Sequence, residues 1–391
     1  MKKVLIVASV ISFIEWFNQE NVDYLHRDLE CEVHIACNLE YMNDTDEERT
    51  LRYLDRLRAE GVKLHNIPFA RSPLSLSNLT AYRMLRKLIR TESFDLIHCH
   101  TPAASVYTRL AARNARHRGT TVMYTCHGFH FHNASAKINW LLYYPIERFL
   151  SLFCDYLVTI NHEDYQRAKT FHCKNVRYIP GVGVDLKRYY SESSDRSGVR
   201  KELGIPENAV MLISIGELIS RKNHQVILKA IAKLQRTDVF CVICGKGEQR
   251  DSLTALAEKL NIRERLILPG FRKDIPRLCK AADIGVFPSK TEGLGLAGIE
   301  MLAAGLPLVS SNVHGIMDYV EDGVNGFACD PDDPAAFASA IEKLISNDML
   351  RYEMKNRSPD SVKRYDLPNA LSAMREIYEE ILMQTDLGVA K

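Results

Sequence analysis

The segment PSKTEGLGLAGIEMLAAGLP, residues 288–307, holds the densest group of residues suited to chemistry in this chain. Gly293 and Gly295 permit a tight turn, and the composition from Leu296 onward favours a helix. The amides of Leu294, Gly295 and Leu296 would then lie at a helix N-terminus, where they and the positive end of the helix dipole form an anion site. We expect a diphosphate to bind there.

Two glutamates, Glu292 and Glu300, flank this expected phosphate site. Carboxylates repel a phosphate, so we interpret the pair as hydrogen-bond acceptors for neutral hydroxyls, such as those of a sugar and a ribose. The pair therefore indicates a polyhydroxylated ligand. The alternative is a helix that merely exposes two glutamates.

Glu292 and Glu300 have seven residues between them, ProSer before them and MetLeuAlaAlaGlyLeuProLeuVal after them. This pattern resembles the signature of the retaining GT-B glycosyltransferases of family 4, and the resemblance covers nearly the whole chain. In that family the first glutamate binds hydroxyls of the donor sugar and the second binds the nucleotide ribose. The resemblance implies an α/β GT-B fold, in which two doubly wound Rossmann-like domains face a central cleft.

A second matching region is ISIGELISRKNH, residues 213–224, in which Lys222 precedes an expected helix. Lys222 matches the lysine that holds the donor diphosphate in this family, where loss of one such fixed contact costs about 3 kcal/mol of transition-state stabilisation. Many members also carry an arginine where this chain has Glu217, so we expect Arg221 to supply that charge. A solvated lysine at a helix start is the alternative for Lys222.

Two further loops follow strand-like runs. CGKGEQ, residues 244–249, matches the family's loop beside the donor, which makes Gly245 a donor-site residue. GFRKDI, residues 270–275, matches the turn that holds the nucleotide base, where Arg272 would donate to a pyrimidine carbonyl. The alternatives are an ordinary strand-to-helix turn and a surface arginine.

Histidines gather in CHGFHFH, residues 126–132, and in HCH, residues 98–100. A zinc site at the first group is disfavoured, because no carboxylate lies in the segment and the spacing fits neither a helical pair nor a zinc ribbon. The segment instead resembles the family's catalytic loop, which places His127 near the donor sugar. His98 and His100 either line the acceptor side or pack at a strand end.

Short β-branched runs alternate with helical patterns along the chain, which predicts βαβ units and parallel sheets. We expect an acceptor-binding domain at 1–190, onto which a C-terminal helix at 368–391 packs back, and a nucleotide-sugar-binding domain at 191–367. Ligands should lie beyond the carboxyl ends of the strands. The predicted strands are 4–8, 32–37, 96–99, 121–126 and 156–160, then 210–215, 239–244, 266–268, 284–287 and 308–310.

Composition limits the class of protein. The 51 Lys and Arg against 49 Asp and Glu leave a net charge of +2, so no global field favours nucleic acid. The ten scattered cysteines suit buried thiols in a reducing cytosol. No run of about 18 apolar residues predicts a membrane span, and the apolar run after Lys2 and Lys3 lacks a signal-peptide cleavage site.

Basic residues recur at helical spacing at Arg83, Arg86, Lys87 and Arg90, and again at Arg109, Arg113 and Arg116. The two stripes are either solvated helix faces or a surface that rests on anionic lipid. The aromatic segment 138–153 is either core or an apolar groove for a lipid.

Segments 138–153, 160–165 and 178–189 resemble a subgroup that acts in bacterial capsular and exopolysaccharide assembly, usually on a polyprenyl-diphosphate-linked saccharide. The resemblance therefore implies a cytoplasmic, peripheral membrane hexosyltransferase that uses a UDP-sugar, with N-acetylhexosamine among the candidate sugars. The family implies retention, no cofactor and no metal, because Lys222, Arg221 and helix amides neutralise the leaving group. The alternatives are a sugar-nucleotide 2-epimerase of the same fold and a catalytically silent nucleotide-sugar-binding scaffold.

Overall fold

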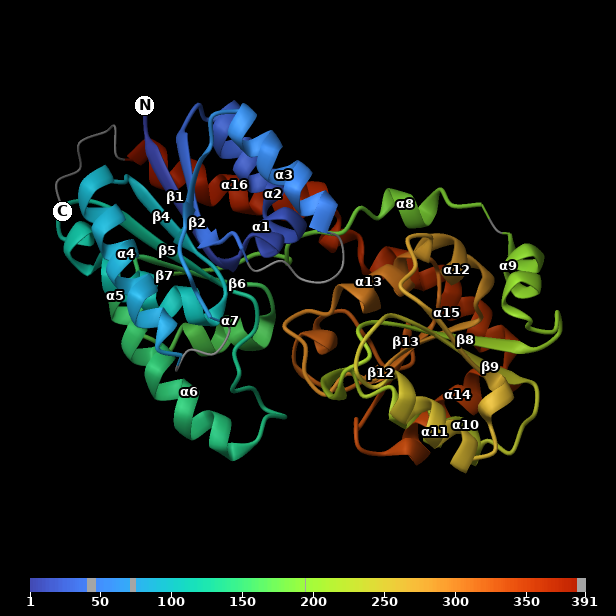
Figure 1. Ribbon diagram of the computed structural model, residues 1–391. Helices are drawn as coiled ribbons and strands as arrows, with labels where there is room; N and C mark the ends of the chain where they lie inside the picture. The colour runs from blue at the N-terminus through green and yellow to red at the C-terminus, as the bar shows by residue number, and fades with distance from the viewer. Residues whose placement is uncertain (41–46, 71–74, 194, 385–391) are drawn as a thin grey trace. The chain divides into compact units, whose positions relative to one another are not determined.

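The computed structural model describes residues 1–40, 47–70, 75–193 and 195–384, and the chain divides into two α/β units (Figure 1). Unit 1 comprises Met1–Val182 with Pro368–Lys391, and unit 2 comprises Gly183–Leu367. The first unit ends before residue 190, because the Val184 amide already donates to the Tyr365 carbonyl at 2.9 Å. Residues 385–391 of the predicted C-terminal helix lie outside the described residues.

The sheet of unit 1 is parallel, with the strand order β3-β2-β1-β4-β5-β6-β7. All five strands predicted in this half are confirmed, and β3 and β7 are additional edge strands. The edge strands escaped prediction because neither has a fully buried residue and so neither forms an apolar run. The strands are β1 (Lys3–Val10), β2 (Glu32–Asn38), β3 (Lys63–Asn66), β4 (Leu96–Cys99), β5 (Thr121–Cys126), β6 (Tyr156–Thr159) and β7 (Asn175–Tyr178).

Helices connect these strands. Buried residues of α4 and α5 form one core with Phe129, Phe131 and the central strands. The helix α16, from the other end of the chain, joins this unit, because the Tyr378 hydroxyl lies 2.8 Å from His98 Nδ1. The α-helices of unit 1 are α1 (Ile11–Phe17), α2 (Gln19–Asp23), α3 (Glu47–Ala59), α4 (Ser77–Glu92), α5 (Pro102–Arg116), α6 (Lys137–Leu150), α7 (His162–Ala168) and α16 (Leu367–Gln384).

The sheet of unit 2 is also parallel, with the order β10-β9-β8-β11-β12-β13. All five predicted strands are confirmed, and β13 is an additional edge strand. The strands are β8 (Val210–Ile215), β9 (Val239–Cys244), β10 (Leu266–Gly270), β11 (Ile284–Phe287), β12 (Leu308–Ser311) and β13 (Gly326–Cys329). The α-helices are α8 (Lys187–Tyr190), α9 (Arg196–Leu203), α10 (Gln225–Lys233), α11 (Arg250–Lys259), α12 (Ile275–Ala281), α13 (Leu296–Ala303), α14 (Pro334–Ser346) and α15 (Asp348–Ser361).

Each sheet reverses its direction of winding beside its first strand, between β1 and β4 in unit 1 and between β8 and β11 in unit 2. In open α/β sheets, ligands bind outside the carboxyl ends of the strands at this switch point. The loops that follow β4, β8 and β11 are therefore where side chains of functional interest should lie.

The prediction of a second basic stripe on α5 is wrong for two of its three members. Arg109 is fully buried and forms an ion pair of 2.9 Å with Glu147, while its guanidinium lies 4.3 Å from the Tyr124 ring centre. Arg116 binds Asp155 at 2.9 Å. Helical spacing alone does not distinguish a solvated arginine from one that reaches a carboxylate on the next element.

The ten cysteines are free thiols and buried, as the sequence predicts. Among the described residues, no helix combines the length and apolar character needed to cross a membrane.

Candidate active site

The switch point of unit 2 brings Lys222 and Glu292 together, although 70 positions separate them. Lys222 ends a 3-10 turn after β8, Glu292 follows the neighbouring strand β11, and Lys222 Nζ lies 2.6 Å from Glu292 Oε1. Arg221 completes the group with Nη1 at 3.1 Å from Glu292 Oε2. The structure thus brings together three of the predicted site residues, two cations and the carboxylate that they share.

Hydrogen bonds between the two loops hold this group in place. The Asn223 side chain donates to the Pro288 and Pro331 carbonyls at 3.1 and 2.8 Å, and the Lys290 amide donates to the Arg221 carbonyl at 2.9 Å. Asn223 adopts a left-handed conformation with φ of +57°, which asparagine tolerates better than most residues. Sequence reasoning missed Asn223, and its only signal was its place directly after Lys222.

Glu292 is an anion at neutral pH. Burial raises the pKa of its carboxyl, but the charges of Lys222 and Arg221 outweigh burial, so the net shift is downward. The side chains of Lys222 and Glu292 are only 14% and 9% exposed. Their charges act in a poorly solvated site, where a fixed cation stabilises developing negative charge more strongly than it would in water.

Helix α13 begins at Leu296 beside this ion-paired group, as predicted, with Gly295 as its N-cap at φ of +83°. A Cβ on residue 295 would lie 2.6 Å from the Phe287 ring, so the turn requires glycine for both conformation and space. The amides of Leu296 and Ala297 have no earlier turn of the helix to donate to, whereas the Gly298 amide donates to the Gly295 carbonyl at 3.0 Å. No acidic residue lies in this turn. A helix start of this kind suits an anion, and the contact of the Leu294, Gly295 and Leu296 amides with a diphosphate stays a prediction.

Glu300 lies further along α13, which packs against α8, the helix that carries Tyr189. Burial raises the pKa of Glu300, and the interaction with Tyr189 opposes that shift only in part. Tyr189 is a second residue that sequence reasoning missed.

Gly245, predicted to lie beside the donor, lies at a point where two loop backbones come close together. A Cβ on this residue would lie 1.9 Å from the Gly216 carbonyl oxygen, and a Cβ on Gly216 would lie 3.3 Å from the Lys222 side chain. The loops after β8 and β9 therefore touch, and Gly216 borders the lysine.

We expect Gly245→Ala to destabilise unit 2 by about 3 kcal/mol, because the new methyl must displace backbone. Gly204→Ala is the matched control, because a Cβ there meets no atom within 4 Å and costs only about 1 kcal/mol of left-handed strain. Urea unfolding followed by far-UV circular dichroism measures both changes. An equal loss of unfolding free energy in the two variants would contradict the close contact between Gly245 and the Gly216 carbonyl.

Arg272 is held by carboxylates. Its Nε and Nη2 donate to Asp274 at 2.7 and 2.6 Å, and its Nη1 donates to Glu202 at 2.7 Å. The predicted contact between Arg272 and a nucleotide base stays a prediction, and such a contact would have to coexist with these ion pairs.

In unit 1, a chain of hydrogen bonds ends at His127. The Asn21 side chain donates to Asn18 at 2.7 Å, Asn18 Nδ2 lies 3.0 Å from His100 Nε2, and His100 Nδ1 lies 3.1 Å from His127 Nε2. Because an amide nitrogen only donates, His100 accepts on Nε2 and donates from Nδ1. Neutral His127 then carries its proton on Nδ1, from which it can donate to a hydroxyl.

Burial lowers the pKa of these histidines, to about 4 for His127 and to about 3 for His98, with His100 well below its usual value. His98 is enclosed by Thr125 and Tyr378, each 2.8 Å from a ring nitrogen. His98 is thus a buried packing residue, whereas His100 and His127 border a small pocket at the carboxyl ends of the strands.

The lowered pKa values predict that unit 1 loses stability as the pH falls from about 6.5 toward 4, because the unfolded chain then binds more protons than the folded chain. With three such histidines, the free energy of unfolding should fall by about 4 kcal/mol for each unit by which the pH is lowered near pH 5. Both tryptophans, Trp16 and Trp140, lie in unit 1, so urea unfolding followed by tryptophan fluorescence measures this unit.

His100→Asn should reduce that slope by about 1.4 kcal/mol per pH unit, whereas exposed His117→Asn should leave it unchanged. An unchanged slope in His100→Asn would mean that His100 is protonated in the folded protein.

Metal-ligating side chains converge elsewhere. Among the described residues, the group with suitable spacing is Glu32, His34 and Glu92, and it excludes the histidines of residues 126–132. Lys63 Nζ lies 2.5 Å from Glu32 and Lys3 Nζ lies 3.2 Å from Glu92, so lysines already neutralise these carboxylates.

Comparison with known proteins identifies the family of this chain. Residues 195–360 match the family model of glycosyl transferases group 1, and residues 14–188 match that of glycosyltransferase family 4. The putative glycosyltransferase EpsD of Bacillus subtilis (strain 168) is 35% identical over 390 residues, which cover 96% of each chain.

Two further matches are more distant. The UDP-Gal:alpha-D-GlcNAc-diphosphoundecaprenol alpha-1,3-galactosyltransferase of Escherichia coli is 27% identical over 85% of this chain and 86% of its own. The crystal structure of Anabaena HepE in complex with UDP and glucose superposes with a TM-score of 0.76 and 20% identity, over 97% of this chain and all of that one. The two parallel α/β units are those of the GT-B fold, and the chain belongs to the group 1, family 4 glycosyltransferases.

Proposed function

We propose that this protein transfers a hexose from a UDP-sugar to a polyprenyl-diphosphate-linked saccharide in bacterial cell-surface polysaccharide biosynthesis. The observation that carries the proposal is the group formed by Lys222, Arg221 and Glu292 at the switch point of unit 2. Two cations and the start of a helix suit a diphosphate, and a buried carboxylate suits sugar hydroxyls.

Each residue has a distinct proposed role. Lys222 and Arg221 bind the diphosphate together with the amides of residues 294–296, and no divalent metal is needed because these groups balance the charge of the leaving UDP. Glu292 accepts hydrogen bonds from sugar hydroxyls, and Glu300 accepts from the ribose. His127 donates to a sugar hydroxyl from Nδ1, which its neutral state allows.

The proposed reaction retains the anomeric configuration. The acceptor oxygen bonds to the anomeric carbon on the face that the leaving group occupies, the bond from that carbon to the phosphate oxygen breaks, and a donor phosphate oxygen takes the acceptor proton. Glu292 is then a binding group and not the nucleophile that a retaining glycosidase requires. This assignment fits a carboxylate already engaged by two cations.

Relatives support the choice of substrates. The structure of Anabaena HepE holds UDP and glucose, and the Escherichia coli relative acts on a sugar linked to diphosphoundecaprenol. The relation to the putative glycosyltransferase EpsD supports sugar transfer, and the proposal of exopolysaccharide assembly rests on the resemblance of segments 138–153, 160–165 and 178–189. We therefore propose that the protein works at the inner face of the plasma membrane, where a lipid-linked acceptor is found. The transferred sugar is to be identified by experiment, and UDP-N-acetylhexosamines are among the donors to be tested.

The test is release of UDP from a panel of UDP-sugars in EDTA, with and without a bacterial extract of polyprenyl-diphosphate-linked saccharides. The proposal predicts release from one sugar that depends on the extract and survives EDTA. An acceptor-free change in the configuration of a UDP-sugar, without transfer, would instead identify a 2-epimerase. Binding of UDP without either reaction would identify a silent scaffold.

A further inference from the structure

Helix α6 presents an apolar stripe to solvent. Its aromatic side chains Trp140, Tyr143 and Tyr144 pack against the core, whereas Leu141 is 71% exposed and Phe149 is 55% exposed. One side of the segment 138–153 therefore packs against the core, as one of the two sequence interpretations holds, while its other side exposes apolar side chains to solvent. The stripe consists of Ile138, Leu141, Leu142, Ile146, Phe149 and, just beyond the helix, Leu152.

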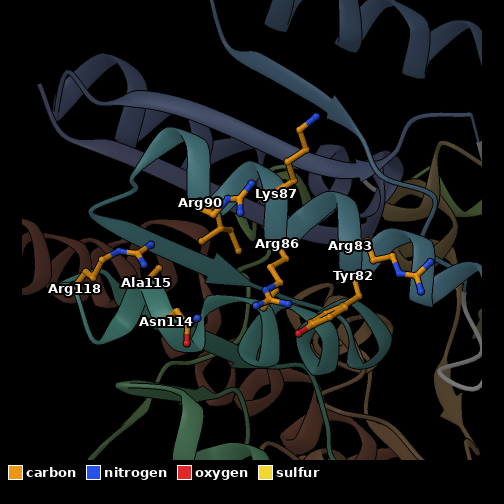
Figure 2. Close-up of a pocket in the computed structure, with 10 residues that line it drawn as sticks. Tyr82, Arg83, Arg86, Lys87, Arg90, Asn114, Ala115 and Arg118 are labelled. Atoms are coloured by element: carbon orange, nitrogen blue, oxygen red, sulfur yellow. The ribbon is translucent and has the colours of Figure 1, made fainter.

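A basic pocket of about 320 Å³ lies between α4 and α5. Figure 2 shows Arg86, Tyr82 and Asn114 extending into the space between the two helices, with Arg90 and Arg118 on one side of it. The predicted basic stripe on α4 thus forms one wall of this pocket, while Ala81, Leu85 and Ile89 of the same helix are buried.

The charge of this basic pocket is uncompensated. Its five cations are Arg83, Arg86, Lys87, Arg90 and Arg118, and no carboxylate lines the pocket. Within the part of the chain that the structure describes, none of these five side chains forms an ion pair, unlike Arg109 and Arg116 nearby. Five like charges around one pocket repel one another, so an anionic partner would stabilise them.

The apolar stripe and the basic pocket belong to one face of unit 1. Helix α5 contacts both α4 and α6, and Figure 1 shows the three helices along the same flank of the sheet. Arg113 of α5 lies toward the stripe, because its guanidinium lies 5.8 Å from the ring centre of Phe153, whose ring centre is 5.3 Å from that of Phe149. Exposed Arg148 adds a charge beside Phe149 on α6 itself.

This face is separate from the candidate active site. The basic pocket includes the ends of α4 and α5, which lead into the amino ends of β4 and β5, whereas His100 and His127 follow the carboxyl ends of the same strands. An anion in the basic pocket would therefore not occupy the sugar site.

We propose that the α4–α6 face docks onto a bilayer of anionic phospholipid. The apolar stripe enters the boundary between headgroups and acyl chains, and the basic pocket binds lipid phosphate groups. A free phosphate would leave the stripe exposed. Symmetric pairing with a second copy would bring the two sets of uncompensated cations together, which charge repulsion opposes. The inference deepens the proposed membrane location, but its test measures binding and not turnover.

Co-sedimentation with phosphatidylcholine vesicles, with and without about 30 mol% phosphatidylglycerol, tests the proposal. We expect binding that requires phosphatidylglycerol and weakens as salt rises. Arg86→Glu with Arg90→Glu should weaken it by at least about tenfold, because two of the five attractive charges are reversed. Leu141→Gln with Phe149→Gln should also weaken it, and this loss should persist at every salt concentration.

The matched controls are Lys233→Glu on α10 and Leu51→Gln on α3, both exposed and both expected to bind vesicles like the wild type. All variants should keep their far-UV circular dichroism and their binding of UDP. Equal binding to both kinds of vesicle, or equal loss in the controls, would overturn the proposal. So would binding of inorganic phosphate without vesicle binding, or a dimer that Leu141→Gln with Phe149→Gln dissociates.

Discussion

Replacing Lys222 with alanine should lower kcat/KM for sugar transfer by about 100- to 1000-fold. The Lys222 ammonium lies 2.6 Å from Glu292 and 5.4 Å from the ring centre of Phe287, so its position is fixed before substrate arrives. A cation fixed in this way stabilises the charge that develops on the departing diphosphate without reorganising. Initial rates of UDP release at saturating acceptor measure the effect.

Lys233→Ala is the control for Lys222→Ala, because it removes an exposed lysine from α10 in the same unit. It should leave kcat/KM unchanged. If Lys222→Ala stayed within about threefold of the wild type, Lys222 would contribute little more than an ordinary surface charge.

Glu292→Gln should lower kcat/KM by a similar factor and also destabilise unit 2 by about 3 kcal/mol. Glutamine keeps the size of the side chain but removes the charge, so mostly buried Lys222 loses its carboxylate. The double variant Lys222→Ala with Glu292→Gln should lose less than the sum of the two single effects, because the two residues contact each other directly. Kinetics and urea unfolding together measure this coupling.

Glu258→Gln, an exposed change on α11 of the same unit, is the matched control and should alter neither kinetics nor stability. Strictly additive effects of the Lys222 and Glu292 substitutions would show that the ion pair does not act as a unit.

The central strands were predictable because a strand buried on both faces of a parallel sheet forms a continuous apolar run. The runs at β1, β5, β8 and β11 are of this kind. The edge strand β3 reads KLHN and is half exposed, so its residues carry no such signal and only pairing with β2 identifies it.

The sequence allowed the residues of the candidate site to be predicted, but not the contacts between their side chains. Lys222 and Glu292 each follow an apolar run, which places both at the carboxyl edge of a sheet. Their direct ion pair depends on β8 lying next to β11, and strand order cannot be read from the local pattern. Arg109 shows the opposite failure, because its helical spacing matched a surface stripe while the fold placed Glu147 beside it.

Calorimetric titration of UDP into the wild type and into Lys222→Ala, in EDTA, tests most directly the claim that the switch point of unit 2 holds the diphosphate of a UDP-sugar. We predict that UDP binds the wild type without metal and that the substitution weakens binding by at least about tenfold, which corresponds to about 1.4 kcal/mol. Equal affinity of the two proteins for UDP, or binding that appears only when a divalent metal is added, would contradict the claim.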